Sequence, residues 1–492
     1  MPLSADTRDT ARIRAAFLDA GYTADRVLDL LGPAANAALA RRESVPARRA
    51  LRAAGGTALS ALVRLFVLGE EVPGDDAAAA LPLEAAARLG LVTRGPAGGV
   101  RALLDARPYD EEFYVVSDIG AGVDGEIHPL PADHVLGVGG ASVALTALTV
   151  PERVGRALDL GTGCGVQALH LSTHADSVVA TDVLPRALDL TRLGAALSGV
   201  ELDVRLGSLF EPVAGERFDL IVSNPPFVIG AAAAGAVRTY RDGGLAGDDF
   251  CRRLIAQAPD YLTEGGFCQV LANWLHVKGE DWAERVASWL PPGCDAWALQ
   301  REVLDPAAYV SMWLHDSGDD AGAGYPAAYD AWLDAFERDA VEAIGFGWIC
   351  LRRTDAASPL RRVEDWPHAV DARLGPHVGA AFHRTAWLHA RTDEVLARER
   401  VRLAEGVVQE LVGRPGADDP EHVVLRQRTG LRRARLADTA AAALVGACDG
   451  TLPLGPLVDA VATVLGEPAT ELRERLVPLA RELLAEGFLE PV

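Results

Sequence analysis

The sequence predicts an α/β protein built around a doubly wound sheet, with mainly helical domains at its amino and carboxyl ends. Short apolar segments of strand length alternate with helix-like segments between residues 156 and 352. A glycine-rich turn, residues 161–165, follows the first apolar segment, and the segment Asn224-Pro225-Pro226-Phe227 follows the fourth. Ligands of such sheets bind outside the carboxyl ends of the strands, where both motifs fall. One site should therefore contain both motifs.

Seven strands and the helices between them make up the predicted central domain, residues 106–355. The strands are expected near residues 156–160, 178–182, 202–206, 218–223, 266–272, 296–304 and 345–352. Helix-like stretches separate most of them, as Val166–Ser172 does after the glycine-rich turn. The segment Asp133–Ser142, which contains several glycines, precedes the first strand and would suit a loop that closes over a ligand.

The two ends of the chain are predicted to form separate domains, because 492 residues are too many for one ordinary core. In the first, residues 1–105, the expected elements are helices at Thr57–Leu68 and Ala77–Leu89 and a hairpin within Leu91–Leu104. In the last, residues 356–492, they are helices at Leu436–Cys448, Leu454–Leu465 and Ala469–Glu486, a turn at Asp449-Gly450 and a final segment Gly487–Leu489. Residues 356–430 have no clear pattern. Both ends resemble winged helices, which bind DNA or dock onto proteins.

The segment Ser223-Asn224-Pro225-Pro226-Phe227 is suited to binding a planar nitrogen. Asn224 offers a side-chain carbonyl, and Pro225 offers a backbone carbonyl whose direction is restricted by the ring of Pro226. Two acceptors of this kind can bind both hydrogens of one NH₂ group, and the ring of Phe227 could lie against its flat face. A purely structural turn after a strand is the alternative interpretation of these residues.

The segment Asp159-Leu160-Gly161-Thr162-Gly163-Cys164-Gly165 is a strand end that runs into a glycine-rich turn, the opening of a nucleotide-binding unit. In the dinucleotide fingerprint the third glycine follows the second by three positions, but position 166 is Val, so the spacing disfavours NAD. Acidic residues end the first two predicted strands, at Asp159 and Asp182. Asp182 is placed to meet ribose hydroxyls, although by itself it could equally cap a helix.

Taken together, Asp159–Gly165, Asp182 and Ser223–Phe227 resemble the class I S-adenosylmethionine-dependent methyltransferases. Within that class the match is to the branch in which Asn-Pro-Pro is followed by Tyr or Phe. This branch includes release-factor glutamine methyltransferases and ribosomal RNA guanine or adenine N-methyltransferases. The resemblance covers roughly residues 106–355 and implies a Rossmann-like, seven-stranded doubly wound sheet, S-adenosylmethionine as the cofactor and N-methylation as the reaction.

The resemblance also implies roles for single residues. The three glycines of the turn would let the backbone approach the methionine part of the cofactor, Asp182 would bind the ribose, and Asn224 with Pro225 would hold the substrate nitrogen. Where the family usually has an Asp facing the adenine, this chain has Ser208, so that contact passes to Ser208 or the backbone, or the adenine is held more loosely. The expected cofactor contacts are Asp159, Gly161, Thr162, Gly163, Gly165, Asp182, Val183, Ser208, Leu209 and Asn224, and the expected catalytic residues are Asn224, Pro225, Pro226 and Phe227.

Several features bear on the substrate. The segment Tyr240–Phe250, followed by a helix and Leu262–Gly266, is similar to the Gly-Asp-Gly-Leu segment that follows the motif in glutamine methyltransferases. The net charge of −22 opposes binding of nucleic acid over the surface as a whole. Phe227 in place of Tyr and the winged-helix-like ends favour RNA. A macromolecular amide or amine is expected, with protein slightly favoured over RNA or DNA. A docking module that binds S-adenosylmethionine without turnover is the alternative of another class.

Two arginine clusters could modify the effect of the net charge. Each is expected to be a solvated helical face, and the alternative is contact with phosphates or an acidic partner. The clusters are Arg41, Arg42, Arg48, Arg49 and Arg52, and Arg426, Arg428, Arg432, Arg433 and Arg435.

The cysteines and the hydropathy indicate a cellular compartment. The six cysteines form no Cys-x-x-Cys pair and no zinc spacing, so a reduced, cytoplasmic protein without a metal site is expected. Cys164 is expected to be a small packing residue and not a nucleophile. The sequence begins without a basic and apolar leader, and no apolar run reaches the length of a membrane span, so we expect a soluble protein without a membrane partner.

Overall fold

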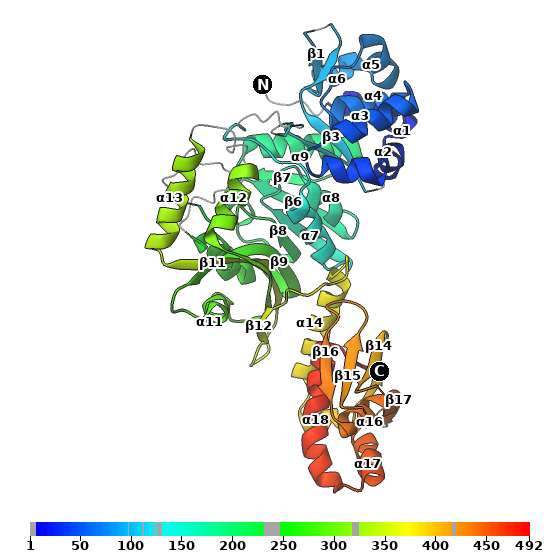
Figure 1. Cartoon of the computed structure of the whole chain (residues 1–492), viewed down its shortest axis with the longest axis vertical. Coiled ribbons are helices and arrows are strands. Elements are labelled where there is room, and N and C mark those ends of the chain that lie inside the picture. Colours follow the sequence, from blue (N-terminus) through cyan, green and yellow to red (C-terminus); the bar gives the residue numbers. More distant parts are fainter. Residues whose placement is uncertain are drawn as a thin grey trace.

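The computed structural model describes residues 6–96, 98–110, 113–120, 122, 124, 130–230, 247–316, 324–415 and 420–492. The molecule is elongated, with the amino-terminal helices at one end, a large sheet in the middle and the carboxyl-terminal part at the other end (Figure 1). In this described part of the chain, no helix has both the length and the apolar composition that crossing a membrane requires.

The central sheet is mixed, and the described residues contribute eight strands to it, in the order β12-β10-β11-β9-β8-β5-β6-β7. Neighbours from β9 to β7 run parallel, whereas β11 is antiparallel to both β9 and β10, and β12 is parallel to β10. The strands are β5 (Val154–Leu160), β6 (Ala175–Asp182), β7 (Asp203–Leu206), β8 (Phe218–Ser223), β9 (Leu262–Val277), β10 (Cys294–Leu304), β11 (Val341–Arg353) and β12 (Arg361–Asp365).

The seven predicted strands are confirmed, but the prediction of a seven-stranded sheet was wrong by one strand. The eighth, β12, lies at the edge of the sheet beside β10, and its sequence Arg-Arg-Val-Glu-Asp contains one apolar residue. Because an edge strand has one neighbour and exposes much of its surface, it needs no apolar pattern, and none was there to find.

Helices cover both faces of the sheet, as a doubly wound fold requires. Neighbouring residues of β5 point to opposite faces, so Ala157 packs in one buried cluster with α7, α8 and α14, and Leu158 in another with α10 and α11. The helices are α7 (Gly140–Leu148), α8 (Val166–Leu171), α9 (Pro185–Ser198), η2 (Glu211–Val213), α10 (Asp249–Gln257), η3 (Ala258–Tyr261), α11 (Trp282–Ala287), α12 (Pro306–Asp316), α13 (Tyr325–Arg338) and α14 (Gly375–His389).

The order of the strands reverses between β5 and β8. From β5 the chain moves outward to β6 and β7, and then returns to place β8 on the other side of β5. The carboxyl ends of β5 and β8 are therefore neighbours, and the Ser223 hydroxyl at the end of β8 donates a hydrogen bond to the carbonyl of Leu160 at 2.7 Å. This reversal is the place where doubly wound sheets bind ligands, and it brings the two predicted motifs together.

The amino-terminal part is mainly helical. Its elements are α1 (Thr7–Asp19), α2 (Ala24–Leu39), α3 (Val45–Ala54), α4 (Ala58–Leu62), the π-helical η1 (Val63–Val67), α5 (Gly74–Ala80), α6 (Leu83–Arg88), β1 (Val92–Arg94), β2 (Val100–Ala102), β3 (Asp105–Tyr109) and β4 (Phe113–Ser117). One predicted helix, Ala77–Leu89, is in fact two helices. Leu81 is extended, with φ −150° and ψ 137°, and Pro82 follows it, which removes an N–H and disfavours helical geometry at Leu81.

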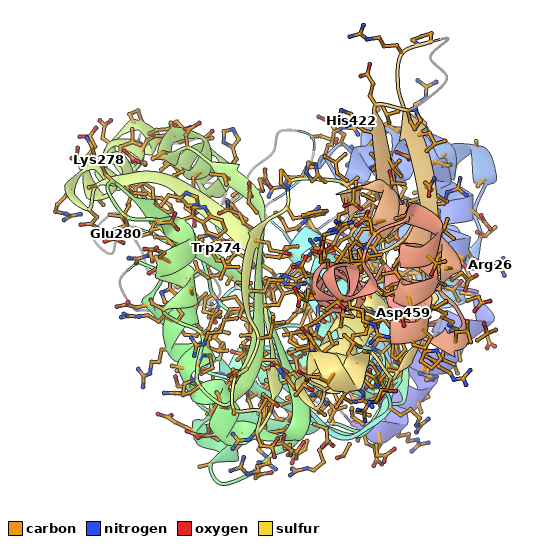
Figure 2. The ribbon with its side chains drawn as sticks, turned by 90° about the horizontal axis from the view of Figure 1, so that it is seen from below. Arg26, Trp274, Lys278, Glu280, His422 and Asp459 are labelled. Atoms are coloured by element: carbon orange, nitrogen blue, oxygen red, sulfur yellow. The ribbon has the colours of Figure 1, made fainter. Side chains whose placement is uncertain are left out.

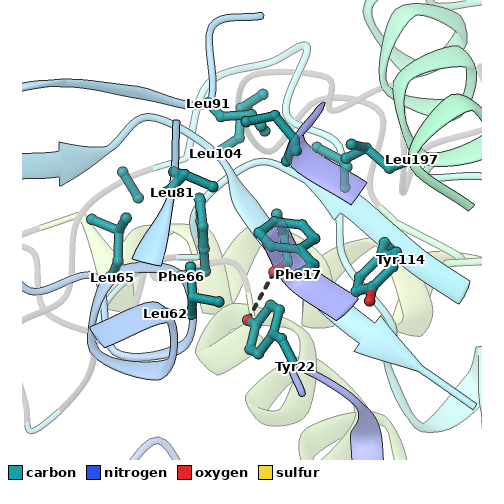
Figure 3. Packing of buried hydrophobic residues seen from close by; sticks show 14 of the residues in the cluster. Phe17, Tyr22, Leu62, Leu65, Phe66, Leu81, Leu91, Leu104, Tyr114 and Leu197 are labelled. Atoms are coloured by element: carbon teal, nitrogen blue, oxygen red, sulfur yellow. Dashed lines mark hydrogen bonds between the residues drawn. The ribbon is translucent and has the colours of Figure 1, made fainter. Parts of the chain in front are cut away.

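The amino-terminal core is continuous with the central domain. Phe17 is fully buried, its ring lies 4.9 Å from that of Tyr114 on β4, and the hydroxyl of Tyr22 donates to the carbonyl of Ala106 at 2.9 Å (Figure 3). Leu197 of α9 belongs to the same buried cluster. The amino-terminal part therefore packs directly against a helix of the sheet, and its position beside the site is set by this shared core.

The carboxyl-terminal part joins the sheet through α14. Phe382 of this helix packs in the cluster on one face of the sheet, and Leu388 packs in the core of the carboxyl-terminal part. Its other elements are α15 (Asp393–Leu396), β13 (Arg400–Leu403), β14 (Val407–Val412), β15 (His422–Gln427), β16 (Ala434–Ala437), α16 (Thr439–Ala447), β17 (Asp449–Pro453), α17 (Leu454–Leu465), α18 (Ala469–Glu486) and β18 (Leu489–Pro491). Figure 2 shows two residues of this part, Asp459 of α17 and His422 of β15. It also shows Lys278 and Glu280, which lie in the turn after β9 of the central sheet.

Three predictions for this part were wrong in detail. The helix expected from Leu436 begins at Thr439, because β16 continues to Ala437 and Asp438 caps the helix through a hydrogen bond from Ala441 N. The turn expected at Asp449-Gly450 is the start of β17. The second arginine cluster lies on β15, on β16 and in the turn between them, so it is not a helical face.

Candidate active site

The turn after β5 requires glycine at three positions. Gly161, Gly163 and Gly165 have φ values of +78°, +56° and +82°, a region in which residues with a side chain are strained. A Cβ at Gly161 or Gly163 would meet no atom within 4 Å, because the backbone there faces open space. The turn therefore leaves its backbone open at these two glycines, and it closes with a hydrogen bond from Gly165 N to the Thr162 carbonyl at 2.8 Å.

Asp159 supports this turn from behind. Its side chain is buried, and Oδ2 accepts hydrogen bonds from Thr162 Oγ1 at 2.6 Å and from Ala168 N at 2.9 Å. Among the described residues, Oδ1 has no hydrogen-bond partner. Burial raises the pKa of the Asp159 carboxyl to about 7, although these two hydrogen bonds partly oppose the shift. Asp159 is thus a buried acid at the base of the turn.

Asp182, at the end of β6, fixes the turn from the side. Its Oδ2 accepts a hydrogen bond from Gly163 N at 2.9 Å, and its Oδ1 accepts one from Leu184 N at 2.9 Å. The hydroxyl of Thr191 on α9 donates to the carbonyl of Gly163 at 3.0 Å, so both backbone groups of this glycine are held. Burial raises the pKa of Asp182, and the backbone hydrogen bonds work against that shift.

A cavity of about 300 Å³ lies at the carboxyl ends of β5, β6 and β8. Its polar lining includes Asp182, Ser208 and Asn224, and its apolar lining includes Leu209 and Leu254. The predicted site residues that line this cavity are Gly161, Thr162, Gly163, Asp182, Val183, Ser208, Leu209, Asn224, Pro225 and Pro226. Asp159 and Gly165 are not among the described lining residues. Cys164, within the turn, does line the cavity; its side chain is buried, and burial raises the pKa of its thiol to about 12.

These residues fit a nucleoside that carries a charged tail. The Asp182 carboxylate lines the cavity and retains acceptor capacity beyond its two backbone hydrogen bonds, which suits vicinal hydroxyls. The open backbone at Gly161 and Gly163 leaves room for close approach of a ligand chain. Leu209 and Leu254 offer an apolar surface to a flat ring, and Ser208 offers one hydroxyl beside it.

A second, larger cavity of about 990 Å³ adjoins the first. Both cavities are lined by Asn224 and Pro225, whereas Phe227 lines the second alone. The second cavity, called the groove below, has one wall from the amino-terminal part, which includes Tyr109, and another from α12, which includes Trp313. Asn224 and Pro225 therefore lie at the junction of the smaller cavity and the groove.

The groove adds residues that the sequence pattern did not indicate. The ring of Phe227 meets that of Trp313 edge to face, with centroids 6.4 Å apart. Tyr109, Met312 and Trp313 line the groove but are far from the motifs in sequence, so no local pattern could identify them. Of the predicted segment Tyr240–Phe250, residues 240–246 lie outside the described residues.

The glycine-containing segment before α7 lines both cavities through His134, Leu136 and Gly137. Asp118 holds it in place, because its Oδ2 accepts a hydrogen bond from Val135 N at 2.9 Å and its backbone N–H donates to the Val135 carbonyl at 3.1 Å. Arg186 of α9 binds the same carboxylate through Nε at 2.8 Å and through Nη2. The segment therefore borders both cavities, and an ion pair between Asp118 and Arg186 fixes it to the helix that follows Asp182.

Comparison with known families agrees with this geometry. Residues 139–281 match the family described as "Methyltransferase small domain". The chain contains an S-adenosylmethionine-dependent methyltransferase domain. Residues 19–103 and 379–491 match two families described as domains of unknown function, DUF7059 and DUF7782. The matched part of the methyltransferase domain begins at the glycines before α7, includes both motifs and continues past the end of β9.

Relatives of this methyltransferase domain include glutamine methyltransferases and ribosomal RNA methyltransferases. A release factor glutamine methyltransferase of Geobacter sulfurreducens is 39% identical over 142 residues, which are 25% of this chain and 50% of the relative. A ribosomal protein uL3 glutamine methyltransferase of Bradyrhizobium diazoefficiens is 32% identical over 164 residues, 31% of this chain and 51% of the relative. A ribosomal RNA small subunit methyltransferase C of Salmonella arizonae is 35% identical over 136 residues, 27% of this chain and 35% of the relative. The chain thus spans about half or less of the length of the curated relatives it matches.

Proposed function

We propose that the protein is an S-adenosylmethionine-dependent N-methyltransferase that acts on a planar amide or amine nitrogen of a macromolecule, with a glutamine-type protein side chain favoured. One observation carries the proposal. Asn224 and Pro225 line both the nucleoside-sized cavity and the groove, so a nitrogen held by their oxygens would lie between cofactor and substrate. A cavity of about 990 Å³ beside them supports a substrate larger than a free amino acid or nucleotide.

Asn224 and Pro225 would act by holding the substrate nitrogen in the orientation that reaction requires. An amide or aryl amine nitrogen has a delocalised lone pair and is a poor nucleophile, but its N–H protons become acidic as the new bond forms. The Asn224 Oδ1 and the Pro225 carbonyl would accept both N–H groups, favour a pyramidal nitrogen and stabilise its developing positive charge. Correct alignment of reactants contributes on the order of 7–11 kcal/mol in well-oriented systems. Phe227 and Trp313 would keep the plane of the substrate group in place.

The remaining predicted residues would hold the cofactor. S-adenosylmethionine, when bound, supplies an electrophilic methyl group on a sulfonium. The carboxylate of Asp182 would accept the ribose hydroxyls, and the glycine turn would approach the methionine part. Ser208 would face the adenine in place of the family's usual Asp, and Leu209 would pack against the ring. Asp159 would act from behind the turn through Thr162 and Ala168.

Charge supports protein over nucleic acid. Arg426, Arg432, Arg433 and Arg435 of the second cluster each form an ion pair, with Glu410, Asp371, Glu364 and Glu486, at N···O distances from 2.6 to 3.1 Å. Arginines already paired with carboxylates are poor phosphate ligands, because the pair must be broken first. The described groove lining carries both signs of charge, with Arg41, Arg42 and Arg107 as well as Glu43, Asp105 and Asp118.

The second candidate is an exocyclic amine of guanine or adenine in RNA or DNA. It is favoured by the three arginines of the groove and by the aromatic side chains Tyr109, Phe227 and Trp313, on which a base could stack. This alternative needs the groove arginines to face phosphates despite the carboxylates beside them.

The two ends of the chain would be winged-helix domains that recruit the substrate, with boundaries near residues 105 and 355. At the amino end, the helical segment α4–η1 is followed by Val72, then by α5, α6 and the β1–β2 hairpin. Val72 forms a β-bridge with Val100, with N···O hydrogen bonds of 2.9 and 2.8 Å. At the carboxyl end the order is α16, β17, α17, α18 and β18, and the strand between β17 and β18 is β13, from earlier in the chain. Docking onto a partner is the role this arrangement would serve.

The test is transfer of radiolabel from S-adenosylmethionine into a lysate of cells that lack this protein, divided afterwards between protease and nuclease. Release of the label by protease supports the protein substrate, and release by nuclease supports RNA or DNA. Binding of S-adenosylmethionine without any macromolecular label would contradict the proposal and leave a small-molecule substrate or a docking role.

A further inference from the structure

The loop that carries Asn224 is anchored at its far end by a buried tyrosine. The backbone N–H of Ile229 donates a hydrogen bond to the hydroxyl of Tyr309 at 2.8 Å. Tyr309 belongs to α12 and is fully buried, and Asn273 Nδ2 of β9 donates to the same hydroxyl at 3.3 Å. Burial raises the pKa of Tyr309 well above its ordinary value, and the hydrogen bonds from Ile229 and Asn273 oppose the shift only in part. The hydroxyl is therefore neutral at physiological pH.

The near end of the loop is anchored as well. Ser223 donates to the Leu160 carbonyl at the end of β5 at 2.7 Å. Residues 224–228 therefore lie between one anchor on β5 and another on α12. Pro225 and Pro226 have no N–H, which limits the hydrogen bonds that the loop itself can form. The position of the loop must then depend strongly on its two ends.

Tyr309 is well placed to act as a fixed point. Its ring lies 5.5 Å from that of Phe346 on β11 and 6.0 Å from that of Phe336 on α13, centroid to centroid. Val228 and Ile229 are buried in the same apolar cluster. Because α12 and α13 lie between β10 and β11 in the chain, this anchor comes from an insertion into the strand order and not from the motif.

We propose that Tyr309 is a positioning residue for methyl transfer, whose hydroxyl holds Ile229 N–H and so sets where the Asn224 and Pro225 oxygens lie relative to the cofactor cavity. Tyr309 does not line either cavity among the described residues, so it would act through the loop and would not touch substrate. The predicted effect on catalysis rests on the proposed function. The anchoring of the loop by Tyr309 does not depend on it.

The test compares Tyr309→Phe with Tyr329→Phe in the full-length chain. Tyr329 is the matched control, because its hydroxyl donates to the Ala307 carbonyl and so joins α13 to α12 without reaching the loop. Hydrogen–deuterium exchange measured by mass spectrometry on peptides that cover residues 218–230 reports the anchor directly. Label transfer into the lysate gives kcat and the KM for S-adenosylmethionine, and calorimetry with S-adenosylhomocysteine gives cofactor affinity.

Tyr309→Phe is expected to speed exchange in the loop and to lower kcat by about 10- to 100-fold, since small misplacement of reactants is costly. The KM for S-adenosylmethionine and the S-adenosylhomocysteine affinity should stay within about twofold, as should every value for Tyr329→Phe. Unchanged exchange, or faster exchange with unchanged kcat, would overturn the positioning role. If the wild type transfers no label, the proposed function fails, and the exchange data still decide whether Tyr309 holds the loop.

Discussion

The carboxylate of Asp182 accepts a hydrogen bond from Gly163 N at 2.9 Å, so the end of the second core strand holds the glycine turn that follows the first. Asp182 also lines the nucleoside-sized cavity. A single side chain thus shapes the turn and lines the cavity, and we predict that its replacement affects cofactor binding more than the fold.

Asp182→Asn is expected to weaken S-adenosylhomocysteine binding by about 10- to 100-fold, because a hydrogen bond to a charged group contributes roughly 1.5–3 kcal/mol. Asp176→Asn, on the same strand but largely exposed and paired with Arg153, is the control and should bind normally. Isothermal calorimetry measures both variants. Equal affinity in the two would remove Asp182 from the cofactor site.

Asn224→Ala is expected to lower methyl transfer by about 10²- to 10³-fold, the usual effect of losing one group that stabilises developing charge. The affinity for S-adenosylhomocysteine should change by no more than a fewfold, since Asn224 lies at the edge of the cavity shared with the groove. Label transfer and calorimetry give the two quantities. Retained turnover would refute the role assigned to Asn224.

Gly161→Ala tests whether the turn serves a ligand or only the chain. An alanine at φ +78° is strained by roughly 1–2 kcal/mol, and its Cβ would point into open space. Gly279→Ala is matched, because Gly279 has φ +81°, an equally open surrounding and a place in the turn after β9. Both variants should lose similar thermal stability, but we expect Gly161→Ala alone to lose S-adenosylhomocysteine binding. Normal binding by Gly161→Ala would make the turn purely structural.

Asp159 should make stability depend on pH. Its pKa is about 7 in the folded protein against an ordinary 3.8, so between about pH 4 and 7 the folded state keeps a proton that the unfolded chain has released. The stability of the folded state therefore falls as pH rises through this range and levels off above it. Asp159→Asn can still accept from Thr162 and Ala168 through its one oxygen and has no proton to release.

The measurement is the thermal midpoint of the wild type and of Asp159→Asn at pH 5, 6, 7 and 8. The variant's midpoint minus that of the wild type should rise from pH 5 to 7 and then change little. Parallel curves would mean that Asp159 has an ordinary pKa in the folded protein. The absolute stability of the variant does not enter this comparison.

Local sequence was sufficient to predict much of the fold and the positions of the two motifs. Most of the seven predicted strands contain apolar stretches in a largely buried setting, whereas β7 alternates polar and apolar residues at an edge of the sheet. Gly161, Gly163 and Gly165 mark backbone that other residues adopt only with strain. The prediction failed where the pattern was weak. Strand β12 is polar because it lies at an edge, and the second arginine cluster gave no sign that it was a hairpin whose charges are paired.

What only the tertiary structure decided is how these pieces meet. The sequence determined that a glycine turn and an Asn-Pro-Pro segment would both lie at strand ends, because short-range periodicity and backbone restrictions are encoded residue by residue. It could not reveal that Trp313 and Tyr109 would line the same groove, or that Tyr309 would bind Ile229 N–H from 80 residues away. Such contacts depend on which strands are neighbours and on the packing of α12 against the sheet. These are properties of the whole chain and leave no mark on any single segment.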